Sequence, residues 1–148
     1  MRSVALIESV ENTDSCYPGC LRELGDPPRQ LYFIGDLGAL TVAPVGLVAI
    51  VGTREASQYG LRVAKALGRA FAESGAVVVS GLARGIDSAA HEGALEGGGK
   101  TVAVLGTGPD VPYPVGNRGL HQRIAASGLI LSENEPGQIG RASCRERV

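Results

Sequence analysis

Short apolar runs of strand length alternate with stretches of helical periodicity along most of this chain. Three of the apolar runs end at a glycine, which is typical of a strand followed by a turn. Strand and helix alternating at this spacing favour crossover units with parallel strands. We therefore predict an α/β fold, a Rossmann-like and mostly parallel sheet with helices on both faces. The expected strands are 31–35, 48–51, 77–80, 101–105 and 129–132, and the expected helices are 61–74, 87–96 and 118–126.

The composition agrees with such a sheet and limits the function. Aromatic residues make up only 4% of the chain, so the core must consist of Val, Ile, Leu and Ala, which suits a parallel sheet buried on both faces. The net charge of −1 supplies no overall field that would attract a polyanion, so binding of nucleic acid would depend on local cations. Cys16 and Cys20 form a C-x3-C pair with no second pair or histidine cluster, which argues against zinc.

The chain divides into three parts. Residues 1–47 form an irregular lead-in, and residues 48–137 form the Rossmann-like core. Residues 138–148, "QIGRASCRERV", resemble the translated read-through of a sequencing adapter, and we expect this tail to be non-native and outside the fold. No apolar run approaches the ~18 residues of a membrane span. We expect a cytoplasmic protein with no membrane contact, metal ion or cofactor.

The segment 61–74 has the pattern of an amphipathic helix. Val63, Leu67, Ala70 and Phe71 share one face, which we expect to be the buried one. The opposite face carries cations, and we interpret it as a solvated surface: Arg62, Lys65 and Arg69. Ser57 is a plausible N-terminal cap, and Gly75 follows the last turn as a helix terminator does.

Two loops that follow strands are the candidate site. Ligands of open α/β sheets bind outside the carboxyl ends of the strands. The first loop is Gly52, Thr53 and Arg54, and the second runs through Ser80, Gly81, Leu82, Ala83, Arg84, Gly85, Ile86 and Asp87. Glycine amides, a serine hydroxyl and two guanidinium groups can together hold a phosphate, so these loops predict a phosphate cradle. A merely tight strand–helix connection is the alternative from the spacing alone.

Other polar and aromatic residues near the loops have more than one interpretation. Asp87 would repel a phosphate, so we expect it to cap the helix or to fix the loop by accepting backbone hydrogen bonds. His91 follows Asp87 at i+4, which favours a structural hydrogen-bonded pair over a catalytic one because no nucleophile lies beside it. Tyr59 and Tyr113 are the aromatic residues best placed to stack on a base or to pack over the sheet edge.

Four segments and a lead-in carry a resemblance to a known family. The segments are "VAIVGTREASQYG" (48–60), "VVVSGLARGIDSAAHEGAL" (77–95), "TVAVLGTGPDVPYPVGN" (101–117) and "LILSE" (129–133), and the lead-in is "YPGCLRELGDPPRQLYFIGD" (17–36). Together they resemble the DNA-processing protein A family, also called the Smf family. The resemblance implies a non-enzymatic protein that binds single-stranded DNA and delivers it to the RecA recombinase during natural transformation. It implies a homodimer, and it assigns DNA binding to the same two loops.

The resemblance also has gaps, and two other functions stay open. The family continues with further strands, basic residues and a dimer surface, so we expect this chain to be a fragment that is incomplete at its C-terminal end and holds half of a DNA site. A nucleotide-binding sensor could use the same cradle. A nucleoside-monophosphate phosphoribohydrolase would need a glycine loop after a strand, whereas the nearest string, "GGGKT" (97–101), precedes one.

Overall fold

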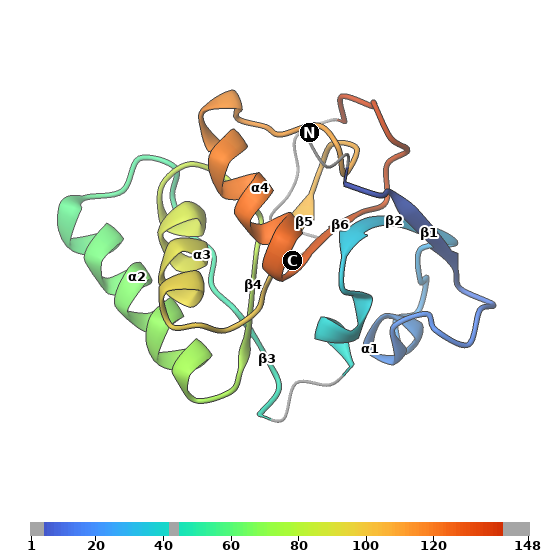
Figure 1. Cartoon of the computed structure of the whole chain (residues 1–148), viewed down its shortest axis with the longest axis horizontal. Coiled ribbons are helices and arrows are strands. Elements are labelled where there is room, and N and C mark those ends of the chain that lie inside the picture. The colour runs from blue at the N-terminus through green and yellow to red at the C-terminus, as the bar shows by residue number, and fades with distance from the viewer. Residues whose placement is uncertain (1–4, 42–44, 141–148) are drawn as a thin grey trace.

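A computed structural model of the chain describes residues 5–41 and 45–140, which form a six-stranded sheet in the order β1-β2-β6-β5-β4-β3 (Figure 1). Strands β3 to β6 are parallel, β2 runs antiparallel to β6, and β1 runs antiparallel to β2. The predicted Rossmann-like, mostly parallel α/β fold is therefore confirmed. The strands are β1 (Glu8–Glu11), β2 (Gln30–Gly35), β3 (Leu47–Ala49), β4 (Val77–Ser80), β5 (Thr101–Leu105) and β6 (Leu129–Ser132).

The three long helices lie close to their predicted positions. They are α2 (Gln58–Glu73), α3 (Ile86–Glu96) and α4 (Arg118–Ser127). The Ser57 cap is confirmed, because its Oγ accepts a hydrogen bond from the Gly60 amide at 3.1 Å. Gly75 follows α2 with a positive φ of 91°, as a terminator should. The short elements β1, α1 (Gly19–Arg22) and the 3-10 turns η1 (Leu37–Leu40) and η2 (Val115–Asn117) were not predicted.

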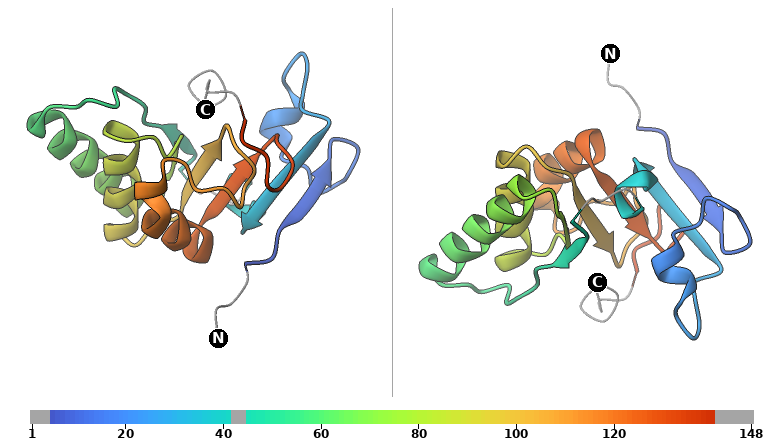
Figure 2. Two further views of the ribbon diagram at one scale, coloured as in Figure 1. Left: turned by 90° about the horizontal axis from the view of Figure 1, so that it is seen from above. Right: turned by 90° about the horizontal axis from the view of Figure 1, so that it is seen from below.

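Helices cover both faces of the sheet, but unequally. One face packs against α3 and α4, where Ile124 of α4 meets Ala103 and Ile130 of the sheet. The other face carries Val102 and Leu131 and is covered by the lead-in, including α1 and η1 (Figure 2). The lead-in therefore covers one face of the core, and the three long helices lie on the other face.

Helix α2 buries a different face from the one predicted. Val63 and Leu67 are exposed, whereas the buried residues of α2 are Ala64, Gly68 and Ala72. The reason is that α2 packs mainly on α3 and lies outside it, away from the sheet (Figure 1). The two backbones approach so closely that a Cβ on Gly68 would lie 2.3 Å from the Ala90 carbonyl oxygen. Only small side chains fit this contact, so Val63 and Leu67 face outward. Of the other two residues of the predicted face, Ala70 is exposed and Phe71 is half-buried against the core.

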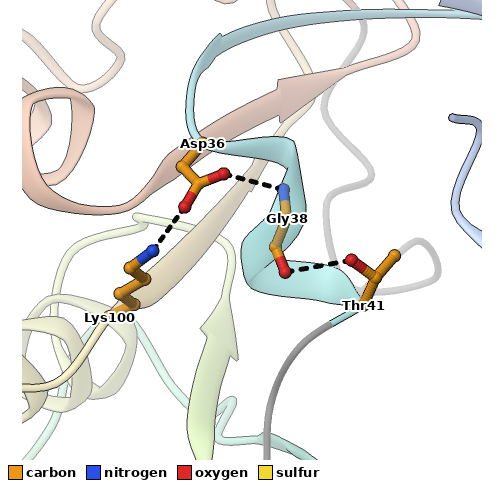
Figure 3. A network of polar contacts seen from close by, with 4 residues as sticks. All are labelled: Asp36, Gly38, Thr41 and Lys100. Carbon is orange, nitrogen blue, oxygen red and sulfur yellow. Dashed lines mark hydrogen bonds and ion pairs between the residues drawn. The ribbon is translucent and has the colours of Figure 1, made fainter.

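An ion pair links the amino end of β5 to the carboxyl end of the antiparallel strand β2. Lys100, directly before β5, donates to the carboxylate of Asp36, whose other oxygen caps η1 by accepting from the Gly38 amide at 2.9 Å (Figure 3). The hydrogen bond from Lys100 is the largest cause of the lowered pKa of Asp36. The "GGGKT" string thus precedes β5, at the opposite end of the sheet from the candidate loops.

The C-terminal segment follows the sheet for a short distance. The Gly108 amide donates to the Gln138 carbonyl oxygen at 2.8 Å, so the first residues of the predicted tail lie beside the β5 loop. Residues 141–148 of that tail lie outside the described residues. Within 5–41 and 45–140 no helix is long and apolar enough to cross a membrane, and no cluster of three or more metal-ligating side chains occurs.

Candidate nucleic-acid interface

The two predicted loops pack directly against each other at the carboxyl ends of β3 and β4. The Ile86 amide donates to the Thr53 carbonyl oxygen at 3.2 Å. Gly85 has φ 83° and ψ −126°, and a Cβ at this position would lie 2.3 Å from the same oxygen. Glycine is therefore required both by the backbone conformation and by the space. This contact brings the exposed side chains of Arg54 and Arg84 to one surface.

Asp87 holds the two loops together from inside. Its Oδ1 accepts from the Gly52 amide at 3.3 Å, and its Oδ2 accepts from the Gly81 amide at 3.2 Å. Burial raises the pKa of the Asp87 carboxyl, and the backbone amides that it binds act in the opposite direction. The expectation that Asp87 fixes the loop is confirmed, whereas the capping alternative is wrong because Gly85 occupies the N-cap of α3.

The internal hydrogen bonds change the chemistry expected of the cradle. Ser80 is fully buried, and its hydroxyl donates to the Ile50 carbonyl oxygen at 2.6 Å. Its single proton is therefore directed at Ile50 and is not available to a phosphate. The carboxylate of Asp87 accepts hydrogen bonds from the Gly52 and Gly81 amides, which the sequence had predicted to bind a phosphate. The groups that the loops present to solvent are therefore the Arg54 and Arg84 side chains, and not the Ser80 hydroxyl or the glycine amides.

The second loop is further fixed by Asn117, which was not among the predicted site residues. Leu82 has φ 58°, a left-handed conformation unusual for leucine, and its fully buried side chain packs on Leu105 and Leu120. Asn117 Nδ2 donates to the Leu82 carbonyl oxygen at 2.8 Å and to Ser88 Oγ at 2.9 Å. The asparagine that ends the Pro-rich stretch "PYPVGN" (112–117) was the signal that could have identified this support.

Asp87 and His91 do not form the pair that their spacing suggested. His91 Nδ1 lies 2.7 Å from Thr101 Oγ1, and that hydroxyl donates to the Val78 carbonyl oxygen at 2.8 Å. Thr101 Oγ1 must therefore accept from His91, which places the proton on Nδ1. Nε2 is buried and has no hydrogen-bond partner among the described residues, and burial lowers the pKa of His91 to about 3. His91 is a neutral core residue.

Two adjoining hollows share the two arginines. The first, which we call the tip hollow, has a volume of about 420 Å³ and is also lined by Gly81, Ala83, Thr107 and Tyr113, and by Ile139 and Gly140 from the predicted tail. The second, which we call the α2–α3 groove, has a volume of about 550 Å³ and includes Arg62 and Lys65. Both hollows include Arg54 and Arg84. Arg54 and Arg84 therefore border both hollows, and we call this shared border the Arg54–Arg84 ridge.

The predicted site residues divide into an exposed set and a supporting set. The exposed residues are Thr53, Arg54 and Arg84, with Ala83 and Gly85 half-buried. Ile86 packs over Gly52, where a Cβ would lie 2.6 Å from its side chain. The supporting residues are therefore Gly52, Ser80, Gly81, Leu82, Ile86 and Asp87. Of the two tyrosines considered for stacking, Tyr113 lines the tip hollow and Tyr59 lines neither hollow.

Comparison with known proteins agrees with the resemblance. The family described as DNA recombination-mediator protein A matches residues 8–144 of this chain. DNA processing protein DprA of Streptococcus pneumoniae is 45% identical over 125 residues, which cover 84% of this chain and 43% of that protein. Protein Smf of a Synechocystis strain is 43% identical over 139 residues, which cover 91% of this chain and 35% of that protein. The chain thus spans less than half the length of these relatives.

Solved structures share the fold. The X-ray structure of DNA processing protein A from Streptococcus pneumoniae superimposes with a TM-score of 0.81 at 43% identity, covering 89% of this chain and 45% of that one. A structure of the Helicobacter pylori protein, which concerns its single-stranded DNA binding mode, gives a TM-score of 0.79 at 35% identity, covering 97% of this chain and 63% of that one. With its sequence and its fold matched along nearly the whole length, this chain belongs to the DNA processing protein A (DprA/Smf) family of DNA recombination mediators.

Proposed function

We propose that this chain binds single-stranded DNA at the carboxyl ends of β3 and β4, without catalysing a reaction. Arg54 and Arg84 bind the sugar-phosphate backbone, and Tyr113 offers a face on which a base can stack. The Gly52, Ser80, Gly81 and Asp87 contacts position these side chains and do not bind the phosphate themselves. Binding of this kind reads the backbone and depends little on base sequence.

The observation that carries this proposal is the placement of Arg54 and Arg84. They come from two different loops, line the same two hollows, and form no ion pair with any described acidic residue. A guanidinium group that lacks an internal carboxylate keeps its donors available for an external anion. The chain carries a net charge of −1, so this local pair of cations must supply the attraction.

Replacing Arg54 tests the proposal. Arg54→Ala removes a charge-assisted hydrogen bond of about 1.5–3 kcal/mol, so affinity for a labelled oligothymidylate should fall about tenfold or more. Fluorescence anisotropy measures this loss. Arg29→Ala is the matched control, because Arg29 is an exposed arginine just before β2, on the far side of the sheet from β3, and also lacks an ion pair among the described residues. We expect that variant to bind as the unaltered chain does.

The same titration separates the other functions. Tight binding of AMP that an oligonucleotide does not displace would contradict DNA binding and favour a nucleotide sensor. Release of ribose 5-phosphate from AMP would contradict the absence of catalysis. Equal affinities of the Arg54→Ala and Arg29→Ala variants would show that the two loops are not the binding surface.

Delivery of the bound strand to RecA, a role in natural transformation, and homodimer formation are proposals for the intact protein. They rest on the family to which the chain belongs, and this chain covers only 43% of the Streptococcus pneumoniae relative. The cytoplasm is the compartment in which these roles would be exercised.

A further inference from the structure

The α2–α3 groove gathers more positive charge than the candidate loops alone provide. Arg62 and Lys65 lie in the first two turns of α2 and enter the groove beside Arg54 and Arg84. The sequence suggested that Arg62 and Lys65 belong to a solvated helix face. Both are exposed, but packing of α2 on α3 turns them toward the loop that follows β4.

The carboxylates near the groove do not cancel this charge. Glu92 is bound to Arg123, with Nη1 and Oε2 3.1 Å apart, and Lys65 is bound to Glu96 at 2.8 Å. Glu55 also borders the groove, but the three guanidinium groups of Arg54, Arg62 and Arg84 form no ion pair with a described acidic residue. With the paired residues Lys65 and Glu92 set aside, three guanidinium groups face one lining carboxylate, Glu55, so the groove is positive.

Small and apolar residues are part of the lining of the groove. Ala56, Leu61 and Ala89 line it, together with Gly85 at the start of α3. A lining that combines apolar side chains with several cations suits a sugar-phosphate chain better than a single free anion, because the sugars can contact the apolar side chains while the phosphates meet the guanidinium groups. Continuity with the tip hollow through Arg54 and Arg84 gives such a chain a route from one hollow to the other.

We propose that single-stranded DNA runs from the tip hollow across the Arg54–Arg84 ridge into the α2–α3 groove, where Arg62 binds a further phosphate. This inference rests on the proposed function and extends its site to the first two turns of α2. Lys65 contributes charge at the edge of the groove, weakened by its pairing with Glu96.

The test compares two arginines of one helix in the full chain. Arg62 lines the groove, whereas Arg69 lies two turns further along α2, lines neither hollow and is bound to Glu73 at 2.7 Å. Arg62→Ala should weaken binding of a long oligothymidylate several-fold and make the salt dependence of log K shallower by about 0.7, the value for one phosphate on a single strand. Arg69→Ala should change neither quantity. Arg62→Lys should restore the salt dependence, because it keeps the charge.

Oligothymidylates of increasing length provide a second readout. The effect of Arg62→Ala should be absent for lengths that fill only the tip hollow and should appear once the strand reaches the groove. If Arg54→Ala weakens binding while Arg62→Ala and Arg69→Ala bind equally at every length, the groove is not on the path, and the proposed function stands without it. If the unaltered chain binds no oligothymidylate, both proposals fall.

Discussion

Asp87 and His91 are buried titratable residues one helical turn apart, yet each is bound to a different part of the sheet. Asp87 joins the loops after β3 and β4, and His91 hydrogen-bonds to Thr101 at the start of β5. His91 is fully buried, and its Nε2 has no partner in the part of the chain that the structure describes. Burial away from water disfavours the charged imidazolium, which is why the pKa is so low.

The low pKa of His91 predicts how stability depends on pH. The pKa is lowered from 6.5 to about 3 by burial, so below about pH 6.5 the unfolded chain binds a proton that the folded chain does not. The free energy of unfolding should therefore decrease as the pH falls from about 6.5 toward 3, by about 1 kcal/mol per pH unit. Urea denaturation at several pH values measures this slope.

His91→Gln is the comparison for that slope, because its amide can still donate to Thr101 while it does not titrate. Burial also lowers the pKa of His121, and that contribution is the same in both proteins. The variant should be less stable at neutral pH but should lose less stability on acidification. Parallel curves for the two proteins would contradict a neutral, buried His91.

At the level of single residues, the sequence predicts which loops form the candidate site but not the hydrogen-bond partners of their polar groups. The two loops were predicted from glycines that follow apolar runs, and both arginines reach one surface. The partners of the polar groups were not predictable, because Ser80 bonds to Ile50 and Asp87 bonds to Gly52, residues 30 and 35 positions away. Such contacts depend on which strands are neighbours, and a single loop does not encode that.

Among the contacts between elements, the packing of α2 on α3 has the largest effect on the geometry of the candidate site. Small residues on both helices allow the backbones to approach, since a Cβ on Gly93 would lie 2.0 Å from the Lys65 carbonyl oxygen. This close contact sets the position of Arg62 and Lys65 relative to the loop after β4. The geometry of the α2–α3 groove therefore depends on glycines that never touch it.

Gly68→Ala tests the contact against helix propensity. Alanine favours an isolated helix by about 1 kcal/mol, but here its Cβ would lie 2.3 Å from the Ala90 carbonyl oxygen. The helices must separate, so we expect a net loss of about 1–3 kcal/mol in thermal or urea denaturation. Gly119→Ala in α4 is the control, because no atom lies within 4 Å of that Cβ and the variant should be neutral or slightly stabilised. A stabilised Gly68→Ala variant would mean that the helices are not in close contact.

Periodicity predicted that α2 exists and where it is capped, but it failed to predict which face is buried. Val63 and Leu67 form a helical apolar stripe, and a helix lying on a sheet would bury such a stripe. A helix packed tightly on another helix selects its small residues instead. The hydrophobic pattern does not distinguish these two environments. The helix was therefore predicted correctly, but the element on which it packs was not.

At the scale of the whole molecule, the sequence predicts one edge strand of the sheet but not the other. Strand β1 was not predicted because only Val10 of its four residues is buried, so it lacks an alternating pattern. Strand β3 was predicted from its apolar run, and in the described part of the chain it is the edge strand at the other end of the sheet. The continuous run of parallel strands β3 to β6 was the most predictable part, because every connection within it is a crossover.

The central claim is that Arg54 and Arg84 together hold the backbone of single-stranded DNA. The most direct test is the slope of log K against log salt for an oligothymidylate, measured on the full chain and on the Arg54→Ala/Arg84→Ala variant. Because each phosphate neutralised on a single strand contributes about 0.7 to the slope, the variant should give a slope shallower by about 1.4, together with weaker binding at every salt concentration. A slope unchanged by removing both arginines would contradict the account.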